Sequence, residues 1–101
     1  MKMQKRKLAT DRRDEVLTVA LQLATDVGYK QVTRKLISNR IGITEQAIQH
    51  HIGTMEKLRR DIMRAAIRTE CLPVIAQGMA SRDPHAMKAD DALKAKARAA
   101  L

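Results

Sequence analysis

Gly42 constrains the fold more than any other residue, because it joins two short helical patterns that each begin with a threonine. Thr33 precedes the first pattern and Thr44 precedes the second, which covers roughly residues 45–52. Threonine caps a helix by accepting a hydrogen bond from a free amide, and glycine adopts the left-handed conformation that ends helices. The region 33–58 is therefore predicted to form a helix-turn-helix.

The composition predicts a thin, all-helical core in one small domain. Of the 101 residues 45% are hydrophobic, but fifteen of these are alanine and Tyr29 is the only aromatic. The core must therefore consist mainly of leucine, isoleucine, valine and methionine. These residues are expected to lie on helices, because no stretch shows the alternation of apolar and polar residues that is typical of a strand. Because so small a core gives a monomer only marginal stability, we expect a homodimer that buries more apolar surface. The single cysteine, Cys71, lacks the neighbours of a metal site and is interpreted as a helical packing residue.

The formal net charge of +9 favours an anionic partner. Charge alone does not separate nucleic acid from an anionic membrane. No apolar run approaches the roughly 18 residues needed to span a bilayer, and no signal-peptide segment follows the basic start. We therefore expect a soluble, cytoplasmic protein with no membrane partner.

The chain is predicted to begin with a flexible basic arm, residues 1–10, followed by a long helix over residues 11–27. The arm is either a solvated tail or an extra contact to phosphate or to the minor groove. Six apolar positions mark the buried face of the helix: Val16, Val19, Ala20, Leu23, Ala24 and Val27. Gly28 ends this helix, and Tyr29 is expected to fold back against it.

Residues 55–71 are predicted to form a fourth long helix, which Pro73 kinks or ends. The remainder, residues 72–101, is predicted to be a short helical dimerisation tail. It consists of a short segment over residues 73–79, a polar turn through Gly78, Ser81 and Arg82, and a last helix over residues 84–101 capped by Asp83. One line of that helix carries small side chains, namely Ala86, Ala89, Leu93, Ala97 and Ala100. This line is either a dimer seam or a consequence of alanine's helix propensity.

Over residues 14–67 the chain resembles the DNA-binding domain of the tetracycline-repressor (TetR) family. The matching residues are Ala20, Leu21, Leu23, Ala24, Gly28, Tyr29, Thr33, Ile37, Ser38, Arg40, Gly42, Ile43, Thr44, Ala47, Ile48, His50, Glu56 and Leu58. The resemblance implies a three-helix DNA-binding core with a fourth helix, over residues 11–71, in which the third helix enters the major groove.

The chain departs from the family pattern in two respects. Gly53 stands where proline is common, and Met55 stands where a phosphate-binding lysine is common, so Thr54, Lys57 and the basic arm would have to replace the usual clamp. Only about thirty residues follow the fourth helix, which is too few to enclose a drug-sized pocket of several hundred cubic ångströms. We therefore expect a truncated regulator that has no small-molecule effector.

Gln46 and Gln49 are the best candidates for reading bases, and Glu45 is a weaker one. On a helix starting at residue 45 these side chains face outward, whereas Ala47, Ile48 and Ile52 face inward. Glutamine can bind adenine through two hydrogen bonds, and glutamate can accept from the amino group of cytosine. Exposed glutamine and glutamate are also ordinary solvent-facing residues.

The candidates for phosphate contacts lie at helix starts, where free amides and the helix dipole favour anions. They are Thr33, Arg34, Lys35, Thr44, His50, Thr54 and Lys57. The threonines can also act as caps alone. His50 and His51 are adjacent but point about 100° apart on a helix, and no third ligand is suitably spaced, so no metal is expected.

The leading hypothesis is a sequence-specific transcriptional repressor that binds a pseudopalindromic operator in double-stranded DNA as a homodimer. One alternative is a nucleoid or architectural protein that uses its charge without reading bases. Another is a basic helical adaptor that binds an acidic protein or a membrane surface. No phosphate-cradling glycine loop, nucleophile elbow or acid-base pair is present, so neither an enzyme nor a cofactor is expected.

Overall fold

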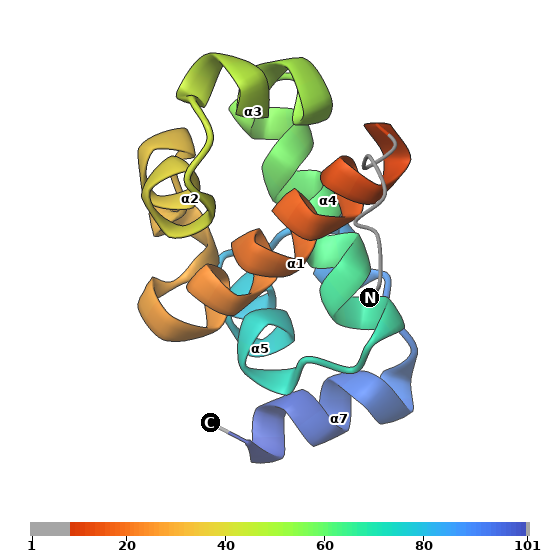
Figure 1. The fold of residues 1–101 in the computed structure, drawn as a ribbon. Coiled ribbons are helices and arrows are strands. Elements are labelled where there is room, and N and C mark those ends of the chain that lie inside the picture. Colours follow the sequence, from red (N-terminus) through yellow and green to blue (C-terminus); the bar gives the residue numbers. More distant parts are fainter. Residues whose placement is uncertain (1–8, 101) are drawn as a thin grey trace, which may run out of the picture.

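The computed structural model describes residues 9–100, and this part of the chain is helical with no strand. The all-α class predicted from composition is confirmed. The helices run in the order α1 (Ala9–Val27), the 3₁₀ turn η1 (Tyr29–Gln31), α2 (Arg34–Ile41), α3 (Glu45–Ile52), α4 (Met55–Arg68), α5 (Leu72–Ala80), α6 (Pro84–Met87) and α7 (Asp91–Ala99). Figure 1 shows α1 running through the centre, with α3 at one end of the molecule and α7 at the other.

Helix α1 supplies the central face of the core, and it packs against α2, α3, α4 and α5. Val16, Ala20 and Ala24 are fully buried, as their helical spacing predicts. Val27 is the exception, since 47% of it is exposed at the end of the helix. The helix begins at Ala9, two residues before the predicted start, and the rest of the predicted basic arm lies outside the described residues.

Helix α4 ends at Arg68, three residues earlier than predicted, although no glycine is present. Glu70 takes a left-handed backbone with φ of 55°. Its amide bonds to the carbonyl of Ile67 at 3.3 Å, and the Cys71 amide bonds to that of Ala66 at 2.8 Å. This pair of bonds is a Schellman motif, which satisfies carbonyls at a helix end. Cys71 consequently lies outside the helix and precedes α5.

Helix α5 includes Gly78, which was wrongly predicted to lie in a turn, whereas Ser81 and Arg82 lie in the turn after α5 as predicted. A Cβ atom at Gly78 would lie 2.7 Å from the Cβ of Ala86 and would also overlap the end of the Met63 side chain. Glycine here lets α5 approach α4 and α6 closely. The helix ends in a second Schellman motif, in which Arg82 has φ of 58° and the Asp83 amide bonds to Gly78 O at 2.8 Å.

The single last helix predicted over residues 84–101 is wrong, because two short helices replace it. Asp83 caps α6 as predicted, accepting from the amides of His85 and Ala86. Asp90 then caps α7 through the Ala92 amide, which starts a new helix. A second aspartate cap inside the alanine-rich stretch is the local reason for the break.

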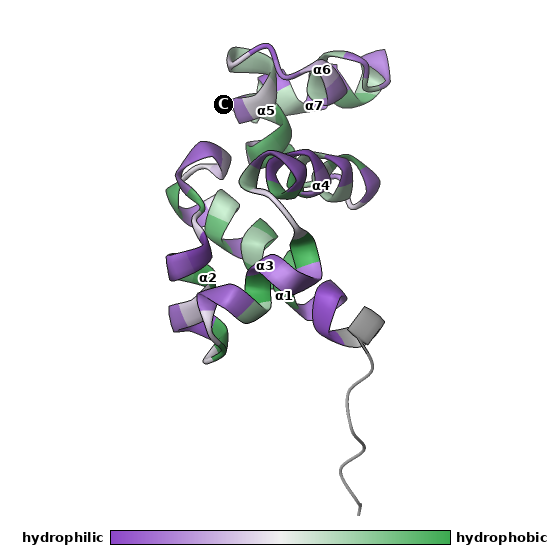
Figure 2. Ribbon diagram, turned by 90° about the horizontal axis from the view of Figure 1, so that it is seen from above, coloured by the Kyte–Doolittle hydropathy of each residue, from purple (hydrophilic) through white to green (hydrophobic). Residues whose placement is uncertain are grey.

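The buried side chains form one cluster that extends from Val16 in α1 to Ala97 in α7. Val74 and Ile75 of α5 are fully buried in this cluster, and so are Ala86 and Ala97. Two members of the alanine line are therefore covered by the chain itself. Figure 2 shows α4 between α1 to α3 on one side and α5 to α7 on the other.

Candidate nucleic-acid interface

The two helices α2 and α3 are joined by a three-residue turn, residues 42–44. The glycine and the capping threonine of this turn adopt the roles that the sequence predicts. Gly42 is left-handed, with φ of 90° and ψ of 24°, and its amide bonds to Ser38 O at 2.8 Å. The Thr44 hydroxyl accepts from the Ala47 amide at 3.0 Å. Each of these contacts lies within five residues, which is why the pattern alone predicts it.

Ser38 contributes a contact to this turn that the sequence interpretation missed. Its hydroxyl donates a short hydrogen bond to the backbone carbonyl of Ile43. The bond ties the body of α2 to the turn that leads into α3. Serine inside a helix gives no sequence signal for such a bond, so the sequence indicates Ser38 only as a match to the TetR pattern.

Helix α3 buries one face and presents another to solvent. Ile48 is fully buried and Ile52 is 2% exposed, so these two side chains hold the helix on the core. Glu45, Gln46 and Gln49 are exposed, as predicted. None of these three side chains makes a hydrogen bond or ion pair with another described residue. They are free to bond to a partner.

Two further helix starts flank α3. Thr33 caps α2 by accepting from the Leu36 amide at 3.2 Å, and Thr54 caps α4 by accepting from the Lys57 amide at 3.1 Å. All three capping threonines are exposed. Their capping role is confirmed, and phosphate binding stays a prediction.

The charged candidates for phosphate contacts also lie at the surface. Lys35 and Lys57 are exposed, whereas Arg34 is half-buried. His50 is exposed, and its ring centre lies 5.5 Å from that of the half-buried His51. Within the described part of the chain, no group of three or more His, Cys, Asp or Glu side chains is placed to hold a metal ion.

Gln77 links the helical tail to the end of α1, and sequence reasoning gave it no role. Its side-chain oxygen accepts from the Tyr29 amide at 2.7 Å, and its nitrogen donates to the Ala24 carbonyl at 3.3 Å. The partners lie 48 and 53 positions away in the chain. No local pattern signals such a contact.

Tyr29 lies at the same junction and is only 4% exposed. Burial raises the pKa of its hydroxyl above the ordinary value of 10.0, and the nearby negative charge of Asp83 raises it further. The side chain of Ser81 acts in the opposite direction by hydrogen bonding to the hydroxyl. The fold therefore favours the neutral phenol of Tyr29.

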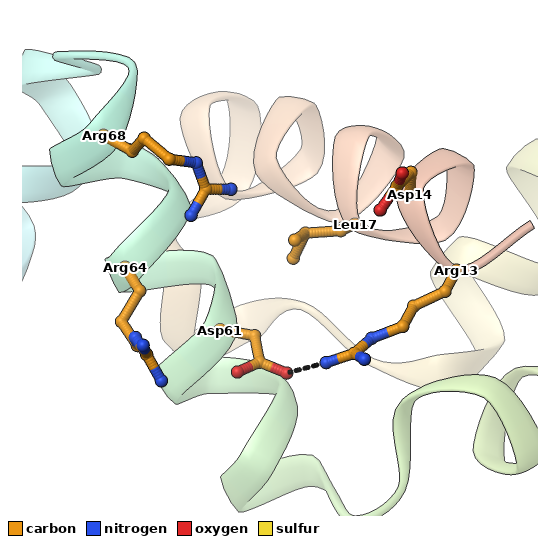
Figure 3. A pocket seen from close by; sticks show the side chains of 6 residues that line it. All are labelled: Arg13, Asp14, Leu17, Asp61, Arg64 and Arg68. Atoms are coloured by element: carbon orange, nitrogen blue, oxygen red, sulfur yellow. Dashed lines mark ion pairs between the residues drawn. The ribbon is translucent and has the colours of Figure 1, made fainter. Parts of the chain in front are cut away.

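An open groove of about 300 Å³ lies between α1 and α4, away from the exposed face of α3. It is lined by Arg13, Asp14, Leu17, Asp61, Arg64 and Arg68. The tail, which was expected to be too short to enclose an effector pocket, contributes no residue to the lining of this groove. Figure 3 shows the lining side chains and the ion pair that crosses the groove.

No family model, curated protein or solved structure matches the chain. The resemblance to the TetR family therefore rests on the residue pattern alone. No helix among the described residues combines the length and the apolar character needed to cross a membrane.

Proposed function

We propose that this chain is a sequence-specific DNA-binding regulator of transcription, most simply a repressor, with α3 as its recognition helix. The observation that supports this best is the exposed face of α3, where Glu45, Gln46 and Gln49 have no described partner. Eight residues of helix are about 12 Å long, comparable to the width of the major groove. The net charge of +9 favours a polyanion as the partner.

The chemistry of the exposed face indicates what α3 would read. Gln46 and Gln49 can each bind adenine with two hydrogen bonds, whereas Glu45 can accept from cytosine. Helix α3 contains no arginine or lysine, which are the usual side chains for guanine. We therefore expect adenine at the bases that the two glutamines contact.

The capped starts of α2 and α4 would hold α3 in the groove. Thr33 and Thr54 place free amides and positive helix ends at the surface, and Lys35 and Lys57 add charge beside them. Contacts of this type go to the DNA backbone, so they would add affinity without sequence preference.

We further propose that two copies bind one operator, because a single two-turn helix reads few base pairs. The recognition helices of such a dimer lie about 34 Å apart on one face of DNA. Ala86 and Ala97 are buried within the chain, so they are not accessible to a second copy. Helix α7 still has three exposed alanines at helical spacing, namely Ala92, Ala95 and Ala99. This surface is the candidate dimer contact.

A selection of bound sequences from random double-stranded DNA tests the proposal. We expect an enriched palindrome with adenines in each half-site, bound by two copies in a sizing measurement of the complex. The Gln46→Ala/Gln49→Ala variant should lose this enrichment while it keeps general DNA affinity. Binding that ignores sequence and weakens steeply with salt would instead indicate an architectural protein. Binding to anionic vesicles but not to DNA would indicate the membrane-surface adaptor.

A further inference from the structure

The groove between α1 and α4 has an apolar floor as well as a charged rim. Leu17 lines it, and a neighbouring hollow of about 280 Å³ that shares Leu17 and Arg68 extends the floor to Leu21 and Ala65. Leu17 and Leu21 are half-buried, so their outer surfaces still meet solvent. A ligand with an apolar body could cover these surfaces and gain free energy from the burial.

The rim of the groove carries more unpaired positive than negative charge. Asp61 lies 3.7 Å from Arg13 and 3.9 Å from Arg60, so two arginines already compensate its charge. Arg64 and Arg68 are exposed and make no ion pair with any described residue. Among the residues that line the groove, Asp14 is the remaining acidic residue that can offset the positive charges of Arg64 and Arg68.

Arg60, Arg64 and Arg68 also repel one another, because they follow at intervals of four residues along one side of α4. Like charges at this spacing destabilise a helix by a few tenths of a kcal/mol per pair. An anion between Arg64 and Arg68 would relieve this repulsion. Figure 3 shows the Arg68 side chain extending from α4 toward Leu17, which brings the charge to the edge of the apolar floor.

We propose that this groove binds a small organic anion, a carboxylate on a short apolar chain. The carboxylate bonds to the guanidinium group of Arg68, whose planar donors match its two oxygens, and Arg64, which Figure 3 shows extending in another direction, adds positive charge one helical turn away. The apolar chain lies on Leu17 and Leu21. The volume of this groove, about 300 Å³, is at the lower end of the range for small-ligand sites, so we expect a small molecule rather than a protein as its occupant. The site does not depend on the function proposed for α3.

Calorimetric titration of the whole chain with octanoate tests the site. We expect saturable binding of octanoate but not of acetate, which lacks the chain, or of octylammonium, which has the opposite charge. The Arg64→Gln/Arg68→Gln variant should bind octanoate at least about tenfold more weakly, because each lost charge-assisted bond costs that much or more. The control variant Arg40→Gln/Arg98→Gln removes the same charge from exposed sites outside the groove and should bind as the parent does.

Methyl NMR spectra locate the ligand independently of affinity. On addition of octanoate, the signals of Leu17, Leu21 and Ala65 should shift most. The proposal is overturned if octanoate does not bind saturably, if octylammonium binds as well, or if both double variants retain the parent affinity. It is also overturned if the largest shifts fall on α3 or α7.

Discussion

The side-chain oxygen of Gln77 accepts a hydrogen bond from the backbone amide of Tyr29 at 2.7 Å, across 48 positions of sequence. The same side chain donates to Ala24, the last buried residue of α1. Gln77 thus gives the Tyr29 amide a partner, and it adds a second hydrogen bond to the Ala24 carbonyl, which also accepts from the Gly28 amide at 3.0 Å. The tail is therefore bonded directly to the helix that supports α2 and α3.

Replacing Gln77 with methionine keeps the size of the side chain and removes both hydrogen bonds. The free energy of unfolding should fall by about 1–3 kcal/mol, because the amide of the buried Tyr29 is left without a partner. Chemical denaturation measures the change. Gln22→Met, at an exposed position of α1, is the matched control and should leave stability within about 0.5 kcal/mol of the parent. Equal loss in both variants would contradict the role of Gln77.

Gly78→Ala should destabilise the protein, although alanine is normally the better helix residue. The added methyl group would meet Ala86 and Met63, and such overpacking costs about 1–3 kcal/mol. Thermal unfolding followed by circular dichroism measures the loss. Adding Ala86→Gly should recover part of it, because this removes the methyl group that lies 2.7 Å away. A Gly78→Ala variant as stable as the parent would mean that α5 can move away from α4 without cost.

Tyr29 should ionise above pH 10.0 in the folded protein, since burial and Asp83 both raise its pKa. A raised pKa means that the fold prefers the protonated phenol. The resulting stabilisation is complete below the unfolded value of 10.0 and is lost as pH rises through the folded pKa. Because Tyr29 is the only aromatic residue, tyrosinate absorbance reports it without interference. A native midpoint at or below that of the urea-unfolded chain would contradict this prediction.

Gln49→Ala should weaken binding to the selected operator by about 1–3 kcal/mol and relax the preference at one base position. Lys57→Ala should weaken binding to all sequences alike and reduce the dependence of affinity on salt, as expected when a phosphate contact is lost. Fluorescence anisotropy at several salt concentrations, with operator and scrambled DNA, separates the two effects. A change of specificity in the Lys57 variant would show that its assignment to phosphate is wrong.

The part of the fold that sequence predicts well consists of contacts between near neighbours. Thr33, Thr44 and Thr54 each accept from an amide three residues ahead, and Gly42 ends α2, so the bounds of α2 and α3 follow from short patterns. The outward positions of the α3 side chains follow in turn from those bounds. What these side chains bind is not a local property, and it stays a prediction.

The end of α4 was missed, and the turn after α5 was predicted to begin too early, at Gly78, because the signals at both helix ends are unusual. Schellman motifs normally place glycine at the left-handed position, but this chain uses Glu70 and Arg82 there. A left-handed backbone costs such residues about 1–2 kcal/mol, so their sequence gives no reason to expect it. Buried neighbours such as Val74 and Ile75 compensate this cost only in the complete fold. The Gln77 contacts and the α1–α4 groove likewise depend on packing between distant segments.

The single hydrophobic cluster has a consequence for synthesis of the chain. Ala97 is among its fully buried members, and α5 brings Val74 and Ile75 into the same cluster that holds Ile48 of α3. The emerging amino-terminal helices can form and pack on one another early, but α5 can pack on α1 and α4, and α7 on α5, only after these later segments have left the ribosome. The part of the core that supports α1 from the side of the tail should therefore be completed last.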